Sequence, residues 1–536
     1  MEEDGILHRV GSPGIAWTRV NTVEAVPSTL TPLCASAFWD DPSERGLRAG
    51  YAEIGVLPGA GARLPRSVDE RIMAIVYGRL AANVDTVRGF ADLMPGTSGD
   101  SVELSIFGSL RPGVVSEPSR RRYPVIAVKM PYAISRLPAR VHATRRRVDS
   151  WWRARTIARP PTNAWQARGL LAEASAWFST AMRYHVEATM IAQAFFEQLA
   201  SVSAETGHEG SETALCTGYG GLEETKVLQG IWDVSRHRIP VGELVSRFGF
   251  LGRGTGELAN PSWRQDPASL DRAVEAYRNR EAASEPTAVE RAQAVRRHQT
   301  VADLLRGTTA TNRTRIRAIL ALAERYVPLR EVGKAAYVQV LDAGRCAATV
   351  LGDHLVREGL LTEPTDVFYL GLDELLTECP DDLRPVVAAR RVLHARFDRL
   401  DMPLNWVGAP VFDEPTEPVQ ATTVLKGLPV CAGRVEGVVR IVSDPGRFDF
   451  VEGEILVCVL TDPSWMPILG MASAAVIDIG GPMSHCAIAA RELGIPAVIN
   501  TKDGTRVLRT GDRVCVDGAA GTVDILQRAT TERSND

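Results

Sequence analysis

The sequence has no C-x-x-C pair: its eight cysteines are scattered at positions 34, 216, 346, 379, 431, 458, 486 and 515. This spacing argues against a structural zinc site and favours reduced thiols. The start, Met-Glu-Glu-Asp-Gly, lacks the apolar stretch of a signal peptide, and no segment has the uninterrupted apolar length of a membrane span. We therefore expect a cytoplasmic protein with no membrane partner and no metal ligands of its own.

A strong net charge is also absent. The 61 Lys and Arg residues nearly balance the 65 Asp and Glu residues, so the net charge of -4 gives no reason to expect nucleic acid as a partner. The sequence has no G-x-x-x-x-G-K-[ST] phosphate-binding loop. With 45% hydrophobic and 24% charged residues, its composition is that of an ordinary globular protein. On length alone we expect about three domains.

Hydrophobic periodicity divides the chain into regions of different character. Residues 1–160 are a mixed region with many Pro and Gly turns, and residues 161–405 have the apolar spacing of helices. Residues 406–424 are expected to be a linker, because they are rich in Pro and lack periodicity. Short strand patterns separated by Gly turns fill residues 425–528, and residues 529–536 are expected to be a tail.

Individual elements follow from the same patterns. The expected helices are 170–200, 269–280, 286–305 and 314–358, the last interrupted near Pro328. The expected strands are 438–442, 454–459, 475–479, 497–499, 513–516 and 522–526.

One stretch near the C-terminus carries chemistry: residues 480–496 read G-G-P-M-S-H-C-A-I-A-A-R-E-L-G-I-P. Ser484 is a good N-cap, and Gly494 followed by Pro496 is a helix stop. His485 is thereby predicted in the first turn of a helix, where unpaired N–H groups favour an anion. An imidazole there is a candidate phosphoryl carrier, with Gly481 and Ser484 as the phosphate-binding residues. The alternative is a core or capping histidine.

This stretch resembles the phosphohistidine swivelling domain of the phosphoenolpyruvate-utilising enzyme family, in the pattern GG-x-x-S/T-H-x-A-I-x-A-R-E-x-G-I-P-A-V. The resemblance implies that His485 carries a phosphoryl group between two distant sites. Met483 stands where many members have threonine, which removes one possible hydroxyl ligand but leaves the carrier in place.

The body of the chain resembles one branch of that family, the rifampicin phosphotransferase-like proteins. The matching segments, in order, are 17–21, 31–33, 95–100, 253–257, 260–266 and 366–370. The resemblance implies a multidomain protein in which a largely α-helical acceptor-binding region precedes a C-terminal swivelling β/β/α phosphohistidine domain. It also implies that Arg19, Asn21, Glu257 and Glu331 contact the substrate.

Residues 330–334, Arg-Glu-Val-Gly-Lys, resemble the R-E-x-x-K element of this branch, which places cations near the transferred phosphoryl group. Arg330 and Lys334 are four residues apart and would share one helix face. Two cations there would neutralise a phosphoryl group in transfer, so both are candidate catalytic residues. The alternative is an exposed Arg/Lys face. His185, in the apolar helix 170–200, is a candidate general base, although a core histidine is the simpler interpretation.

The resemblance leaves two functional hypotheses. Family members that load their histidine from ATP have an ATP-grasp domain. We expect this domain and the family's phosphoenolpyruvate-binding barrel to be missing here. The first hypothesis is a phosphotransferase subunit: a separate ATP-grasp protein, holding ATP and Mg²⁺, loads His485, and the phosphoryl group passes to a small alcohol or phenol. Phenylphosphate synthase is split in this way. The second is a non-catalytic phosphocarrier or regulator phosphorylated on His485. In neither case do we expect a cofactor bound by this chain.

Overall fold

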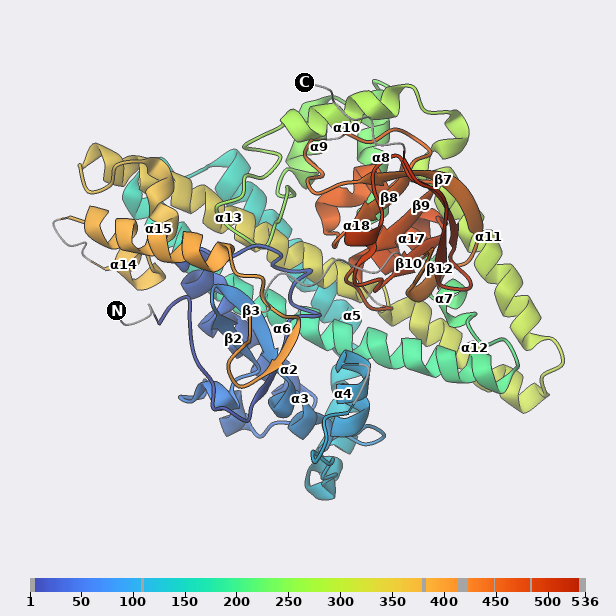
Figure 1. Cartoon of the computed structure of the whole chain (residues 1–536). Helices are drawn as coiled ribbons and strands as arrows, with labels where there is room; N and C mark the ends of the chain where they lie inside the picture. Colours follow the sequence, from blue (N-terminus) through green and yellow to red (C-terminus); the bar gives the residue numbers. More distant parts are fainter. Residues whose placement is uncertain are drawn as a thin grey trace. The chain divides into compact units, whose positions relative to one another are not determined.

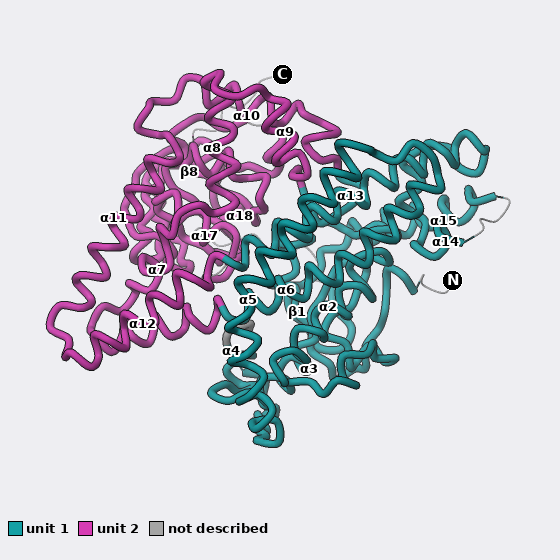
Figure 2. The backbone as a smooth tube through the Cα atoms, turned by 180° about the vertical axis from the view of Figure 1, so that it is seen from behind, with its two compact units in different colours: residues 1–191, 254–260, 329–414 teal, residues 192–253, 261–328, 415–536 magenta. Residues whose placement is uncertain are grey.

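The computed structural model describes residues 5–529 apart from 108–109, 378–381, 413–422, 448 and 483. The chain forms two compact units, each built from separate stretches of sequence (Figures 1 and 2). Unit 1 comprises residues 1–191, 254–260 and 329–414, and unit 2 comprises 192–253, 261–328 and 415–536. The helical region expected at 161–405 thus contributes to both units, and the domain limits drawn from the sequence stay a prediction.

Unit 1 contains a four-stranded antiparallel sheet in the order β2-β3-β1-β4. Its strands are β1 (Ala16–Thr18), β2 (Met73–Val76), β3 (Arg79–Asn83) and β4 (Asn405–Val407). Trp17 of β1 pairs with Trp406 of β4, and both indoles are buried in one apolar cluster with Ala74 and Ala81. Residues 406 and 407, at the start of the expected linker, are therefore strand, because burying Trp406 against this cluster favours the extended pairing.

The α-helices of unit 1 are α1 (Pro32–Cys34), α2 (Asp41–Glu53), α3 (Val84–Ala91), α4 (Gly99–Phe107), α5 (Tyr123–Trp152), α6 (Ala164–Glu205, which continues into unit 2), α13 (Leu329–Arg357), α14 (Leu372–Leu376) and α15 (Arg384–Asp398). Three of them, α5, α6 and α13, are long. Helix α13 is the central one, because nearly every residue from Glu331 to Ala348 is buried. Such burial on all sides is typical of a helix inside a bundle.

Unit 2 begins with a set of helices: α7 (Glu212–Leu215), α8 (Glu223–Ser235), α9 (Val241–Phe248), α10 (Ala268–Arg278), α11 (Pro286–Leu305) and α12 (Ala310–Tyr326). The predictions of helices at 269–280 and 286–305 are confirmed, and the interruption expected near Pro328 separates α12 from α13. No helix among the described residues is long and apolar enough to cross a membrane.

The C-terminal part of unit 2 is an eight-stranded sheet in the order β5-β12-β11-β7-β8-β9-β10-β6. Strands β7 to β10 run parallel, and the other pairs are antiparallel. The strands are β5 (Val424–Lys426), β6 (Leu428–Cys431), β7 (Arg434–Ile441), β8 (Ile455–Cys458), β9 (Ala474–Ile477), β10 (Ala497–Ile499), β11 (Arg513–Asp517) and β12 (Thr522–Gln527); the helices are α16 (Met466–Leu469), α17 (His485–Leu493) and α18 (Gly504–Val507). All six expected strands are confirmed, and so is a helical region followed by a sheet-rich domain.

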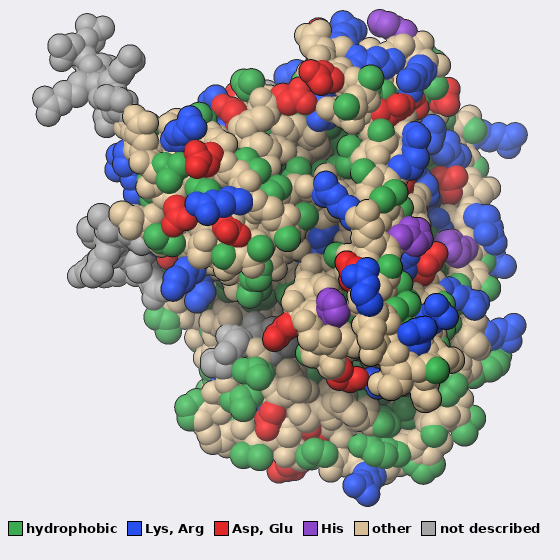
Figure 3. All heavy atoms as spheres, turned by 90° about the vertical axis from the view of Figure 1, so that its right-hand side faces the viewer, with side chains coloured by type: hydrophobic (Ala, Val, Ile, Leu, Met, Phe, Trp, Pro, Cys, Tyr) green, Lys and Arg blue, Asp and Glu red, His purple; other side chains and the backbone are tan. Residues whose placement is uncertain are grey.

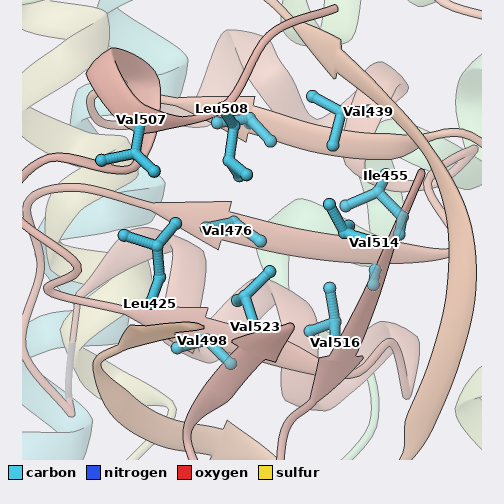
Figure 4. Packing of buried hydrophobic residues seen from close by; sticks show 12 residues of the cluster. Leu425, Val439, Ile455, Val476, Val498, Val507, Leu508, Val514, Val516 and Val523 are labelled. Atoms are coloured by element: carbon cyan, nitrogen blue, oxygen red, sulfur yellow. The ribbon is translucent and has the colours of Figure 1, made fainter. Parts of the chain in front are cut away.

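The core of this sheet is made of small branched side chains (Figure 4). Val476 of β9, Val498 of β10, Val514 and Val516 of β11 and Val523 of β12 are all fully buried in one cluster. β-Branched residues suit such a core, because they pack well on a pleated surface. The result is a rigid platform at the edge of which the His485 segment is held.

Gly518, in the turn between β11 and β12, gives a test of this packing. A Cβ there would lie 2.0 Å from the Cys431 carbonyl oxygen, which is backbone and cannot rotate away. We expect Gly518→Ala to lower the free energy of unfolding by about 2–3 kcal/mol through this overpacking. Denaturant unfolding measures the loss. Gly242→Ala in α9, where a Cβ meets nothing within 4 Å, is the control and should lose no stability; equal behaviour of the two variants would contradict the packing.

Candidate functional site

The segment predicted as a phosphoryl carrier has the local structure that its sequence indicates. Ser484 has an extended backbone, and its hydroxyl accepts a hydrogen bond from the Ala487 N–H at 3.2 Å, so it is the N-cap of α17. Gly494 ends the helix in the left-handed region, with φ of 68°. His485 is the first residue of α17, as predicted, and lies where N–H groups and the positive end of the helix dipole favour an anion.

The His485 ring is oriented by a residue that sequence reasoning missed. Its Nδ1 lies 2.9 Å from the Thr461 hydroxyl, and both side chains are buried. Thr461 follows β8 and His485 follows β9, two adjacent parallel strands, so the loops at their carboxyl ends meet at one sheet edge. When Nδ1–H donates to Thr461, the lone pair of the neutral ring is on Nε2, and that nitrogen is the nucleophile.

The two candidate phosphate-binding residues differ in availability. The Ser484 hydroxyl is already engaged by the Ala487 N–H. Gly481 has open space where a side chain would be, and its carbonyl accepts the Ser484 N–H at 2.9 Å. The His485 side chain is only 1% exposed. Phosphoryl transfer at this ring therefore requires a conformation in which it is uncovered.

The carrier helix α17 is held within unit 2 by its C-terminal end. Glu492 accepts the Gly218 N–H through both carboxylate oxygens, at 3.1 and 3.2 Å. Burial raises the pKa of this carboxyl to about 7, helped by the nearby Glu290 and opposed by the Gly218 hydrogen bond and by Arg491 and Arg297. A buried acid with such a pKa titrates near neutral pH.

This titration should make stability depend on pH. Because the pKa of Glu492 is higher in the folded chain than its ordinary value of 4.5, the folded state keeps a proton that the unfolded state loses, and stability falls as pH rises through about 4.5 to 7. Titration of this carboxyl should lower the free energy of unfolding by roughly 3 kcal/mol over this pH range, since each pKa unit is worth about 1.4 kcal/mol. Glu492→Gln does not titrate, so the variant should lack this decrease. Unfolding curves at several pH values measure it; parallel pH profiles for wild type and variant would contradict it.

Further contacts join the sheet of unit 2 to its helices. The Tyr277 hydroxyl of α10 donates to the Pro467 carbonyl at 3.0 Å, and ion pairs of 2.8 Å link Arg280 to Glu452 and Arg253 to Asp444. The sheet and α8, α10 and α11 thus form one compact unit. The exposed ion pairs contribute little to the free energy of unfolding, so they orient the sheet against the helices of unit 2 without adding much stability.

The R-E-x-x-K element forms the first turns of α13 in unit 1. Arg330 makes an ion pair of 2.5 Å with Glu331, whose carboxylate is buried. Lys334 lies one turn further and is also buried. The interpretation as an exposed surface face is therefore wrong for Glu331 and Lys334. A buried lysine one turn from a half-buried arginine suits an anionic ligand, because a low dielectric strengthens the attraction.

The other predicted substrate residues lie elsewhere in unit 1. Arg19, after β1, donates to the Met402 carbonyl at 3.3 Å, and burial next to Arg79 lowers its pKa to about 10. Asn21 is exposed. Glu257 is buried and accepts the Thr31 N–H at 2.9 Å and the Thr31 hydroxyl at 2.7 Å, a burial that raises its pKa. These contacts give Glu257 a role in holding its loop, and a role in binding substrate stays a prediction for all three.

The described residues contain no group of three or more His, Cys, Asp or Glu side chains placed to hold a metal ion. On the face drawn in Figure 3, Lys and Arg side chains are interspersed with Asp and Glu. Seven cysteines are described, six of them buried, and no disulfide joins any two of these seven. Cys486, next to His485, is one of the buried ones and packs in the core.

Two segments of the chain match protein-family models. Residues 450–521, which include Thr461 and His485, match the mobile domain of PEP-utilising enzymes. Residues 241–331, which end with Arg330 and Glu331, match the fourth domain of rifampicin phosphotransferase. The first match agrees with the resemblance of residues 480–496 to the phosphohistidine domain of phosphoenolpyruvate-utilising enzymes. The second agrees with the resemblance of the body of the chain to rifampicin phosphotransferase-like proteins.

Curated relatives agree with these matches. A rifampicin phosphotransferase of Streptomyces sviceus is 29% identical over 320 residues, which cover 57% of this chain and 37% of that protein. An uncharacterised protein of Mycobacterium tuberculosis is 35% identical over 222 residues, covering 41% and 26%. A probable phosphoenolpyruvate synthase of Staphylothermus marinus is 44% identical over 107 residues, covering 19% and 13%. The chain therefore matches well under half the length of each of these relatives.

Proposed function

We propose that this chain is a phosphotransferase subunit in which His485 carries a phosphoryl group to a small alcohol or phenol. One observation supports the proposal most: His485 begins α17, with its Nδ1 2.9 Å from the Thr461 hydroxyl. A nucleophilic nitrogen, an oriented ring and the amide end of a helix are what a phosphohistidine requires. The match of residues 450–521, which include this histidine, to the mobile domain of PEP-utilising enzymes also supports the proposal.

The transfer step follows from this arrangement. With Nδ1–H donated to Thr461, the phosphorylated ring is a good leaving group, because it departs as neutral imidazole once the P–Nε2 bond breaks. The acceptor oxygen forms the new bond to phosphorus and gives up its proton. Arg330 and Lys334 would stabilise the negative charge of the phosphoryl oxygens during transfer, with Glu331 holding Arg330 in place. Arg19, Asn21 and Glu257 complete the proposed acceptor-binding residues.

We assign the phosphoryl donor to a separate ATP-grasp protein, which would hold the ATP and the Mg²⁺. The support is the resemblance to split members of the family. No bound cofactor is assigned to this chain itself. We also propose a reducing compartment, the cytoplasm, because the cysteines are scattered along the sequence and no disulfide joins those that the structure describes.

Transfer of radioactive label tests the proposal. The chain is incubated with a free-standing ATP-grasp protein and ATP that carries ³²P in both its β- and γ-phosphates, and then with a panel of alcohols and phenols. Label that reaches His485 and then moves to a small molecule supports the phosphotransferase. Label that stays on His485 with every acceptor contradicts it and favours the alternative, a non-catalytic phosphocarrier or regulator. Label that never reaches His485 contradicts both.

A further inference from the structure

One histidine outside the carrier segment lies beside the R-E-x-x-K element. His185, in α6, has its Nδ1 3.2 Å from the backbone carbonyl oxygen of Arg330. A Cβ on Gly333 would lie 2.9 Å from the His185 Cα, so α6 and α13 approach closely at this turn. The ring also packs edge-on against Tyr337, with 5.1 Å between centroids. Two residues of α13, Arg330 and Tyr337, therefore contact the imidazole near the turn that carries the two cations.

The Arg330 carbonyl fixes the tautomer of this ring. A carbonyl oxygen can only accept a hydrogen bond, so the Nδ1 of His185 carries the proton and Nε2 carries the lone pair. Burial, together with Arg330 and Lys334, lowers the pKa of His185 to about 4, while Glu331 acts in the opposite direction. At neutral pH the ring is therefore a neutral base.

Binding of a phosphoryl group near Arg330 and Lys334 would make this ring a stronger base. The positive charges of Arg330 and Lys334 depress its proton affinity. A phosphoryl group bound between them would bring about two negative charges and offset that effect. The proton affinity of His185 then rises as the phosphoryl group arrives, which is when a proton must leave the acceptor.

We propose that His185 is a catalytic residue of the acceptor site and acts as the general base that removes the hydroxyl proton. The inference rests on the proposed function. In the balanced step, the acceptor oxygen bonds to phosphorus, the P–Nε2 bond of phosphohistidine 485 breaks with its electron pair returning to that ring, and the hydroxyl proton moves to Nε2 of His185. Product release and loss of this proton to water restore the neutral ring.

The requirement for a base depends on the acceptor, and this dependence supplies a test. A phenol that is already ionised needs no base, whereas an aliphatic alcohol keeps its proton until the transition state. His185→Asn retains an amide N–H near the Nδ1 position to reach the Arg330 carbonyl but removes the Nε2 lone pair. His298→Asn, on an exposed part of α11, is the matched control.

The experiment starts from full-length protein treated with radiolabelled phosphoramidate, a small reagent that phosphorylates imidazole without a partner. Label on His485 is taken as the difference from His485→Ala protein treated in the same way. Discharge is then followed to benzyl alcohol and, at mildly alkaline pH, to 4-nitrophenol. We expect His185→Asn to load normally, to discharge to benzyl alcohol about 10²–10³-fold more slowly, and to discharge to 4-nitrophenol within about threefold of wild type. His298→Asn should match wild type with both.

The outcomes separate the role of His185 from the proposed function. Equal slowing with both acceptors would mean that His185 only positions α13, and no slowing would mean that it has no role; either result overturns the general base. Wild-type protein that transfers label to neither acceptor overturns the proposed function, and the assignment of His185 is rejected with it. Thermal unfolding of each variant shows that the fold is retained.

Discussion

His485→Ala is expected to take up no phosphoryl label from ATP and an ATP-grasp protein, while its fold stays intact. The variant removes the only nitrogen proposed to form the covalent intermediate, and no neighbouring group can substitute for it. The cost to folding should be small, about 1–2 kcal/mol, because one buried hydrogen bond to Thr461 and part of a small ring are lost. Acid-labile, alkali-stable label on the denatured protein measures the phosphohistidine, and thermal unfolding checks the fold.

The neighbouring residue provides the control for this experiment. Cys486 is buried beside His485 in the same helix turn and is the other nucleophile of the motif. Cys486→Ala should take up label at the wild-type level, because the proposed carrier is the neighbouring imidazole and the thiol only packs in the core. Label that persists in His485→Ala, or that disappears in Cys486→Ala, would show that the carrier has been assigned to the wrong residue.

The carrier segment could be predicted from sequence because its signals are local. A serine N-cap, a left-handed glycine and a following proline act within a few residues of one another, and all three positions take the predicted conformations. The short strands were found for the same reason: β-branched residues recur in them, and turns with glycine stand beside several of them. Strand β10, at 497–499, was predicted to the residue.

What the sequence did not show depends on contacts between distant residues. Strand β4 pairs with β1 almost four hundred residues earlier, so its short pattern carries no local signal. Helix α5 contains Pro131 and Pro138, residues that usually end a helix, and its packing against α13 overrides that preference. Thr461 became a candidate only when β8 and β9 proved to be parallel neighbours.

The acceptor site shows the same limit. The spacing of Arg330 and Lys334 placed them on one helix face, and the structure adds that Lys334 is buried. Nothing in the sequence joined His185 to this element, because the two lie 145 residues apart. Gly333 is the sequence signal that could have indicated this contact, since a glycine inside a helix often marks a close approach by another element.

Lys334→Ala is expected to load His485 at the wild-type rate and to discharge it about 10²–10³-fold more slowly. The ammonium group is proposed to stabilise charge that exists only while the phosphoryl group is transferred to the acceptor, so its loss should affect one half-reaction. Loading is measured as label taken up from phosphoramidate, and discharge as label released to an added alcohol or phenol.

Two further variants make the lysine experiment decisive. Lys334→Met keeps the apolar length of the buried side chain and removes the charge, so it should behave like Lys334→Ala if charge is what matters. Lys129→Ala, an exposed lysine of α5 that donates to the Ala52 carbonyl at 3.2 Å, should change neither half-reaction. If Lys334→Met discharges normally, the slow discharge of Lys334→Ala comes from a packing defect. If both Lys334 variants lose loading and discharge equally, the lysine supports the fold and lies outside the path of the phosphoryl group.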